Sequence, residues 1–249
     1  MDNNDNYCDI NTGICSPNNN EKSSLENNKI EKIKELKITY YYDAFCGWCY
    51  GFSKPFQEFK KNHTDDIAFE VISGGLFLGN RIGKINDIAP YVKDGAFRSV
   101  EEVSGVKFGQ AFIDKLETED NIWLDSTFPA IALSIIKENA PNKALDFAEL
   151  LLKTINLDAK DVREINSYKE AISVIDYDFE NFTSQMKEDK YLNLAKQDFE
   201  TFAKSGISGM PCLVIQGGGK RAYLSNGFTN YKDLEARLKI FKEQISNHS

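Results

Sequence analysis

Two cysteines separated by two residues stand in the segment FCGWCYGF at positions 45–52. A pair at this spacing can hold a metal ion, form a structural disulfide, or exchange disulfides with another molecule. Exchange needs one sulfur that ionises readily and a second sulfur within reach of it. The elements around Cys46 and Cys49 therefore decide which chemistry the pair supports.

A strand is expected before the pair and a helix after it. The run KITYYYD at 37–43 is rich in β-branched and aromatic residues, which is typical of a strand. From Cys49 onward, apolar residues recur at spacings of three and four, which predicts a helix whose buried stripe includes this cysteine. Cys46 then lies at the helix N-terminus, where unpaired N–H groups and the helix dipole favour a thiolate. Pro55 should bend this helix without ending it, because Gly51 can adjust four residues earlier.

This placement predicts Cys46 as the nucleophile and Cys49 as the resolving thiol. Cys46 attacks a substrate disulfide, and Cys49, one helical turn further along, breaks the mixed disulfide that results. A buried pair of free cysteines and half of a zinc site are the alternative interpretations. The strand-to-helix setting favours redox chemistry.

The remaining elements predict a small sheet interrupted by helices. A second strand is expected at 67–73, followed by a long segment in which apolar residues mostly recur at helical spacing. Two strands at 212–216 and 221–225 flank a glycine turn and form a hairpin. An amphipathic helix from 231 to 245 closes the chain. This order predicts an α/β fold interrupted in its middle.

The composition excludes several classes of partner. The chain has 249 residues, 41% of them apolar, and can bury a full core. Its formal net charge of -8 disfavours nucleic acids and anionic membranes as partners. The apolar runs fall short of the roughly 20 residues that span a bilayer, and the first residues do not resemble a secretory signal. We therefore expect a cytoplasmic location, where five cysteines do not imply a disulfide scaffold.

The segments YYYDAFCGWCYGF at 40–52 and GISGMPCLVI at 206–215 together resemble the thioredoxin-fold DsbA family, specifically its FrnE-like branch of cytoplasmic dithiol-disulfide isomerases. The resemblance covers roughly residues 36–245. It implies a thioredoxin-like fold with a large all-helical insertion between the βαβ and ββα halves. It also implies a disulfide oxidoreductase or isomerase without cofactor or metal. Its partners would be disulfide-containing proteins or peptides, and glutathione or another thiol donor.

Four segments follow from the pattern and the resemblance together. A flexible polar head is expected first, because it has few large apolar side chains to offset the entropy of ordering. The two halves of the thioredoxin-like domain and the helical insertion between them make up the rest. The expected bounds are 1–35 for the head, 36–78 and 205–249 for the two halves, and 79–204 for the insertion.

The resemblance also implies roles for residues around the dithiol. Pro211 occupies the position of a cis-proline that lies beside the two cysteines, and the backbone of Met210 would pair with an extended substrate peptide. Gly47 and Trp48 are expected to contact the substrate together with Met210. Gly47 and Trp48 stand where strongly oxidising relatives have a Pro-His dipeptide. The chain therefore lacks an imidazole that would stabilise the thiolate. We therefore expect a less oxidising couple, suited to reduction or isomerisation rather than net oxidation.

Two residues near the expected site are auxiliary candidates with two interpretations each. Asp43, three residues before Cys46, is expected to cap the helix, and relay of a proton to Cys49 is the alternative. The family usually has threonine where this chain has Cys212. This residue is either a third thiol near the pair or a small buried apolar residue.

Cys8 and Cys15 are auxiliary candidates in the head. They bracket an Asn-Thr-Gly turn signal in CDINTGIC and can close a small ring. Exchange with the active dithiol, zinc binding together with Cys46 and Cys49, and no role at all are the other interpretations. Their spacing matches no zinc signature, so no metal is expected.

Two other functions compete with disulfide exchange. Glutathione-dependent isomerases and kappa-type transferases share the thioredoxin core and a helical insertion, but they usually have serine in place of the first cysteine. The intact pair argues against that function. A non-catalytic redox sensor or zinc-binding protein is the second competitor, and bound zinc in the reduced protein would favour it.

Overall fold

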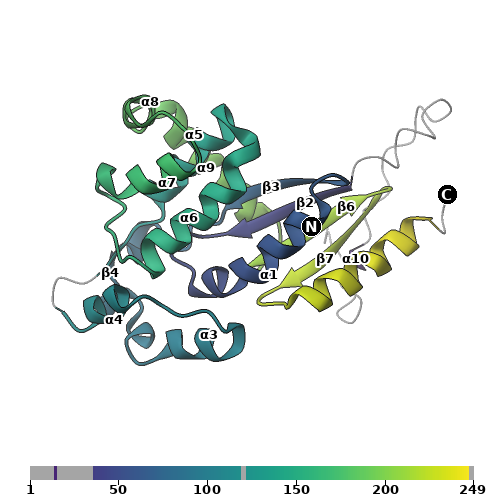
Figure 1. Ribbon diagram of the computed structural model, residues 1–249, viewed down its shortest axis with the longest axis horizontal. Helices are drawn as coiled ribbons and strands as arrows, with labels where there is room; N and C mark the ends of the chain where they lie inside the picture. Colours follow the sequence, from purple (N-terminus) through teal and green to yellow (C-terminus); the bar gives the residue numbers. More distant parts are fainter. Residues whose placement is uncertain (1–13, 16–35, 119–121, 247–249) are drawn as a thin grey trace, which may run out of the picture.

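One mixed sheet organises the molecule, of which the computed structural model describes residues 14–15, 36–118 and 122–246 (Figure 1). The strand bounds are β1 Ile14–Cys15, β2 Leu36–Tyr42, β3 Ile67–Ser73, β6 Cys212–Gly217 and β7 Lys220–Asn226. The strands follow the order β1-β7-β6-β2-β3, in which only β2 and β3 are parallel neighbours. The strand predicted at 67–73 is confirmed, and the strand predicted at 37–43 begins and ends one residue earlier.

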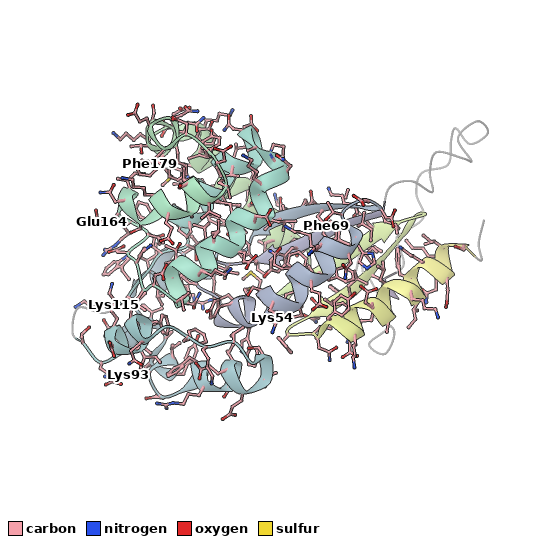
Figure 2. The ribbon with its side chains drawn as sticks, viewed as in Figure 1. Lys54, Phe69, Lys93, Lys115, Glu164 and Phe179 are labelled. Carbon is pink, nitrogen blue, oxygen red and sulfur yellow. The ribbon has the colours of Figure 1, made fainter. Side chains whose placement is uncertain are left out.

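Helices α1 (Gly47–His63) and α10 (Tyr231–Ser246) cover one face of this sheet (Figure 1). The predicted stripe of α1 is buried, and the ring of Tyr40 on β2 lies 4.5 Å from the ring of Phe56. Charged residues such as Lys54 point away from the sheet into solvent (Figure 2). As predicted, the helix continues through Pro55.

The segment between β3 and β6 is helical, as predicted, except for one short strand pair. Its helices gather at one end of the sheet (Figure 1). Their bounds are α2 Ile85–Ile88, α3 Ala96–Ser104, α4 Gln110–Leu116, α5 Thr127–Asn139, α6 Ala144–Asn156, α7 Lys169–Val174, α8 Phe179–Gln185 and α9 Asp189–Lys204. The pair β4 (Gly83–Lys84) and β5 (Trp123–Leu124) is antiparallel and was not expected. None of the helices in the described ranges is long and apolar enough to cross a membrane.

A buried ion pair attaches this helical segment to the sheet. Asp198 of α9 accepts two hydrogen bonds of 2.7 Å from the ammonium group of Lys137 on α5 and one of 3.0 Å from the backbone N–H of Ser73. Burial raises the pKa of the Asp198 carboxyl, while Lys137 opposes this rise. Lys137 therefore supplies the positive charge that the buried Asp198 carboxylate needs where α5, α9 and β3 meet.

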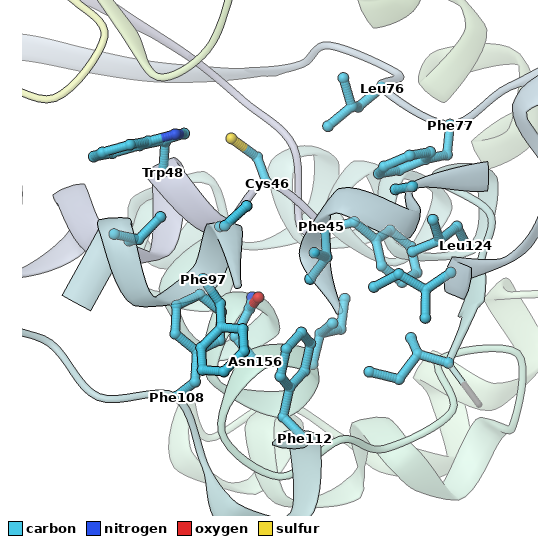
Figure 3. A pocket seen from close by; sticks show the side chains of 18 of the residues that line it. Phe45, Cys46, Trp48, Leu76, Phe77, Phe97, Phe108, Phe112, Leu124 and Asn156 are labelled. Atoms are coloured by element: carbon cyan, nitrogen blue, oxygen red, sulfur yellow. The ribbon is translucent and has the colours of Figure 1, made fainter. Parts of the chain in front are cut away.

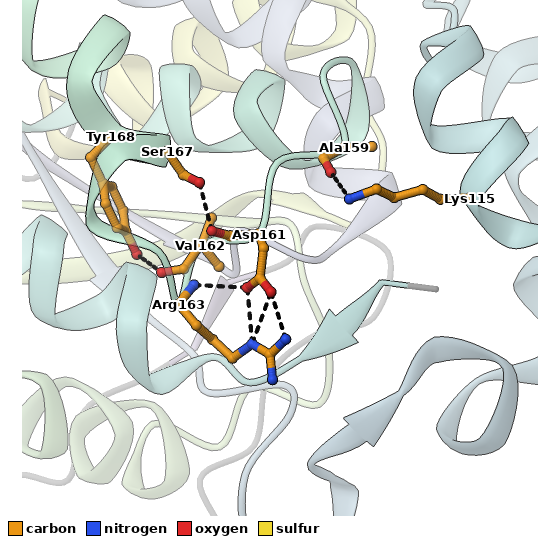
Figure 4. A network of polar contacts seen from close by, with 7 residues as sticks. All are labelled: Lys115, Ala159, Asp161, Val162, Arg163, Ser167 and Tyr168. Carbon is orange, nitrogen blue, oxygen red and sulfur yellow. Dashed lines mark hydrogen bonds and ion pairs between the residues drawn. The ribbon is translucent and has the colours of Figure 1, made fainter. Parts of the chain in front are cut away.

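A second set of polar contacts holds the chain that follows α6 (Figure 4). Asp161 accepts a hydrogen bond of 2.9 Å from the guanidinium group of Arg163, which holds the pKa of Asp161 below its usual value. Lys115 of α4 donates to the carbonyl oxygen of Ala159 at 2.7 Å. These contacts fix the end of α6 against α4, which matters because both helices border the site described below.

The hairpin between β6 and β7 turns at two glycines. Gly218 and Gly219 have φ angles of +57° and +74°, a conformation that favours glycine at both positions of a two-residue turn. Gly217, which the sequence assigned to the turn, belongs to β6 and pairs with Lys220. The turn is therefore one residue shorter than expected.

Two residues of the predicted polar head are described. Ile14–Cys15 form β1, and their backbone pairs with Ala222 and Arg221 at the edge of the sheet. The other residues of the head, Cys8 among them, lie outside the described residues. The prediction of a flexible head therefore stays a prediction.

We expect Lys137→Met to lower the free energy of unfolding by about 2–3 kcal/mol, because it leaves the Asp198 carboxylate without its cation. The figure is below that of a fully buried pair because solvent reaches part of Lys137. Urea unfolding monitored by circular dichroism measures the change. Lys190→Met is the matched control, since it breaks an exposed ion pair with Glu138 between the same two helices. Equal unfolding midpoints for both variants would contradict the role given to the buried pair.

Candidate functional site

Cys46 is the residue that caps the N-terminus of α1. Its sulfur accepts a hydrogen bond of 3.3 Å from the backbone N–H of Cys49, in the place where a cap oxygen usually stands. The prediction that Cys46 lies at the start of the helix is therefore confirmed. A thiolate accepts such a hydrogen bond better than a thiol does, so the cap favours the reactive form.

Cys49 lies one turn further along and has no exposed surface. Burial raises the pKa of its thiol, and the adjacent Cys46 sulfur raises it further. The hydroxyl of Tyr40 lies near this thiol and is itself buried, with no hydrogen-bond partner in the described part of the chain. Burial also raises the pKa of Tyr40, so its hydroxyl stays protonated and can donate.

Met210 and Pro211 lie across from the dithiol. Their peptide bond is cis, as the resemblance implied, and the Cys46 thiol lies 3.6 Å from the carbonyl oxygen of Met210, to which it can donate. The backbone N–H of Met210 has no hydrogen-bond partner among the described residues. The Met210 side chain packs closely on Gly74, where a Cβ atom would lie 2.2 Å from its sulfur. This leaves the Met210 backbone facing the dithiol with a donor available.

The expectation that Asp43 caps the helix is wrong. Its buried carboxylate accepts hydrogen bonds from the backbone N–H groups of Phe45, at 3.0 Å, and Leu76, at 2.8 Å, and the nearby hydroxyl of Ser126 lowers its pKa. Burial raises the pKa of this carboxyl. Asp43 therefore joins the dithiol loop to the segment after β3 and to the start of α5.

Of the described cysteine side chains, that of Cys212 does not join the pair. Cys212 is fully buried on the opposite face of the sheet from α1, with Tyr41 and Val214. This agrees with the interpretation of Cys212 as a small buried residue and not with that of a third thiol. The backbone of Cys15 pairs opposite Arg221, near the hairpin end of the sheet. The roles predicted for Cys8 and Cys15 stay predictions.

An apolar cavity of about 140 Å³ opens beside Cys46 (Figure 3). Cys46, Gly47 and Trp48 line it on the side of the dithiol, and residues of the helical segment line the rest. Trp48 is 37% exposed, and Gly47 packs against the ring of Phe108, 3.3 Å from where its Cβ atom would be. Two of the three residues expected to contact substrate therefore border the cavity.

Two features of this site could not be predicted from the sequence. The cavity walls come from segments far apart in the chain. The local sequence pattern does not distinguish their residues from ordinary core residues. Tyr40 likewise fits the buried pattern of its strand. Its period-2 position placed it on the same face as Tyr42, which was the one available signal that it faces α1.

No family model matches the chain, and no curated protein sequence matches it significantly. Solved structures do. A protein from Nitrosomonas europaea described as a candidate protein disulfide isomerase is 19% identical, with a TM-score of 0.70 over 84% of this chain and 98% of that one. The cytosolic disulfide reductase DsbM from Pseudomonas aeruginosa, solved with GSH, is 17% identical, with a TM-score of 0.64 over the same shares.

A third similar structure is 2-hydroxychromene-2-carboxylate isomerase. It is 8% identical, with a TM-score of 0.57 over 86% of this chain and 99% of that one. These similarities establish the fold: the chain has a DsbA-like thioredoxin fold with a helical insertion between the two halves, as the sequence predicted. They do not by themselves establish which reaction the chain catalyses.

The environments of the thiols predict an order of reactivity toward iodoacetamide. At pH 8 we expect Cys46 to be alkylated in the native protein and Cys49 and Cys212 to be spared. Burial raises the pKa of Cys212 to about 12, so only about one molecule in 10⁴ carries this thiolate at pH 8. Peptide mapping by mass spectrometry reports each cysteine separately. In denaturant all should react; native labelling of Cys212 as fast as that of Cys46 would contradict the structure.

Proposed function

We propose that this chain is a thiol–disulfide oxidoreductase that reduces or isomerises disulfides in protein or peptide substrates. One geometric feature supports this function above others. The sulfur of Cys46 caps a helix, receives a backbone N–H, and lies opposite the carbonyl oxygen of a residue that precedes a cis-proline. A second thiol stands one helical turn away.

The first step transfers a sulfur–sulfur bond to the protein. The Cys46 thiolate attacks one sulfur of a substrate disulfide, and a bond forms between Cys46 and that sulfur as the substrate disulfide breaks. The other substrate sulfur leaves as a thiolate and takes up a proton. The Cys49 N–H stabilises the sulfur of Cys46 before the attack and holds it at the start of the helix.

The second step releases the substrate. Cys49 loses its proton and attacks the sulfur of Cys46, which forms the Cys46–Cys49 disulfide and expels the remaining substrate sulfur as a thiolate. The substrate has then gained two electrons. Cys49 is buried and its pKa is raised, so this step needs a group that stabilises its thiolate. The Tyr40 hydroxyl is placed to donate that hydrogen bond.

A thiol donor completes the cycle. Two molecules of a thiol such as glutathione reduce the Cys46–Cys49 disulfide and leave as the donor's own disulfide. Isomerisation needs no donor, because a second thiol of the substrate can attack the mixed disulfide and return Cys46 as a thiolate. A cytoplasmic location fits this direction, since the glutathione pool there keeps dithiols reduced.

The residues around the dithiol would hold an extended peptide. The free N–H of Met210 can pair with a peptide carbonyl, as at the edge of a sheet. Pro211 keeps this segment out of the regular ladder, which begins at Cys212. Gly47 leaves the approach to the sulfur open, and the exposed ring of Trp48 offers an apolar contact beside it.

Cysteine substitutions test this assignment. With a glutathionylated fluorescent peptide as substrate and reduced glutathione as donor, Cys46→Ser should lower turnover to the rate without enzyme, because no nucleophile remains. Cys49→Ser should accumulate a mixed disulfide on Cys46, because resolution is lost, and mass spectrometry would detect it. Cys212→Ala is the matched control and should keep wild-type turnover. Full activity of Cys46→Ser would refute the proposal.

Tyr40→Phe tests the second step alone. It keeps the ring that packs on α1 and removes the hydroxyl beside Cys49. We expect resolution of the preformed mixed disulfide to slow by roughly ten- to a hundredfold at neutral pH, since a hydrogen bond to a charged group contributes about 1.5–3 kcal/mol. Because the variant makes the Cys49 thiolate harder to form, its pH–rate profile should shift to higher pH.

Stopped-flow measurement separates the two steps of this variant. The first step, attack by Cys46, should be unchanged. Tyr41→Phe is the control, since Tyr41 is adjacent in β2 but lies on the opposite face of the sheet. If Tyr40→Phe resolves the mixed disulfide at the wild-type rate with an unshifted pH profile, the role proposed for the hydroxyl is wrong.

A further inference from the structure

The cavity beside Cys46 has the size of one apolar side chain. Its volume of about 140 Å³ is close to that of a roughly 150 Å³ protein cavity that binds benzene. A ring of that size fits, whereas a charged tripeptide such as glutathione does not. The cavity therefore discriminates between groups by their size and apolar character, on which disulfide exchange at Cys46 and Cys49 does not depend.

The lining has the character of a binding site for an apolar group. Aromatic rings surround the space (Figure 3). Phe45 comes from the dithiol loop, and Phe97 and Phe112 come from α3 and α4 of the helical segment. Apart from the Cys46 sulfur, which is charged when it reacts as a thiolate, no lining residue has an ionisable acidic or basic side chain that is charged at neutral pH. A charged or strongly hydrated group would lose its hydration there without finding a partner, whereas an apolar group gains free energy from burial.

One polar side chain also faces this space. Asn156, at the end of α6, is 2% exposed and donates through its amide nitrogen to the carbonyl oxygens of Leu152 and Ala44, at 2.9 and 3.4 Å. Its amide oxygen has no partner within the described residues. Figure 3 shows the amide group ending among the aromatic side chains of the cavity. The positive edge of an aromatic ring suits this acceptor better than an aliphatic chain does.

Two exposed aromatic residues mark the way into the cavity. Trp48 and Tyr91 line it and are 37% and 56% exposed. Large apolar side chains at the surface around a concave site are typical of a binding site. Because Cys46 also lines the cavity, a group attached near the substrate sulfur can enter while that sulfur is bonded to Cys46.

We propose that this cavity is a specificity pocket for an aromatic side chain adjacent to the reacting cysteine of a peptide substrate. The inference rests on the proposed function and adds the substrate class to it. The peptide backbone pairs with Met210 on one side of Cys46, and the aromatic side chain enters the cavity on the other side. Glutathione lacks such a group and serves as a donor without using the pocket.

Two peptides provide the test. Acetyl-Gly-Phe-Cys-Phe-Gly-amide and acetyl-Gly-Ala-Cys-Ala-Gly-amide are each prepared as the mixed disulfide with glutathione. The wild-type protein should reduce the phenylalanine peptide with a kcat/KM about tenfold or more above that of the alanine peptide, as apolar pockets typically discriminate. Equal values for the two peptides would overturn the proposal.

Variants that fill the cavity assign the preference to it. Ala96→Phe and Val92→Phe each place a ring into the space from a different point of the lining. Each should lower the ratio of the two kcat/KM values toward one. Ala111→Phe adds the same ring on the exposed side of α4 and should keep the wild-type ratio. An unchanged ratio in both filled variants, with both folded, would also overturn the proposal.

A binding measurement separates this inference from the proposed function. The same peptides with S-methylcysteine cannot exchange disulfides, so their affinity, measured by isothermal titration calorimetry, is independent of catalysis. Tighter binding of the phenylalanine peptide, lost in Ala96→Phe, supports the pocket even if the wild-type protein turns over neither disulfide. Equal affinities contradict the pocket even if both disulfides are reduced, because the exchange chemistry alone would then be supported.

Discussion

The buried carboxylate of Asp43 is the group on which the geometry of the site depends. It accepts hydrogen bonds from the start of the dithiol loop and from the segment that follows β3, and the hydroxyl of Ser126 before α5 lies close enough to lower its pKa. A carboxylate without solvent needs such donors, and each donor fixes a different segment. Phe45, which donates one of these bonds, leads directly to Cys46, and Leu76, which donates another, lines the cavity. One side chain thus sets both the nucleophile and the wall beside it.

The two thiols differ in their surroundings because Cys46 stands at the N-terminus of α1 and Cys49 stands inside its first turn. Cys46 caps the helix and meets a backbone N–H, while Cys49 lies in the apolar stripe that packs on β2. Burial makes the thiolate of Cys49 costly to form, whereas the Cys46 sulfur has a backbone N–H donor directed at it. A dithiol with this difference reacts first at one sulfur and resolves at the other. The Tyr40 hydroxyl is buried in the core near these thiols.

The thioredoxin core supplies the dithiol, and the helical insertion supplies most of the space next to it. The fold is shared with a disulfide reductase and with 2-hydroxychromene-2-carboxylate isomerase, so the fold alone does not select the reaction. A cysteine at position 46 allows disulfide exchange, which a serine there would not. Residues of the insertion line most of the cavity beside Cys46. The dithiol and most of the cavity wall thus come from different parts of the chain.

The sequence by itself determined four strands of the sheet, β2, β3, β6 and β7, the two helices on its face, and the position of Cys46 at a helix start, because these follow from local periodicity and capping. The strand β1 lies in the segment expected to be a flexible head. It did not determine what each buried residue contacts. Asp43 was misassigned because a carboxylate before a helix usually caps it, and only the fold brings Leu76 to that carboxylate. Cys212 lies in a strand that is buried on both faces, so the alternation of side chains alone did not show which face of the sheet it occupies. The pairing of the strands decided this. The cavity is formed by segments distant in the chain, and the proximity of Tyr40 to Cys49 depends on how α1 packs on β2. The local sequence pattern predicts that a residue is buried but not which residue it contacts.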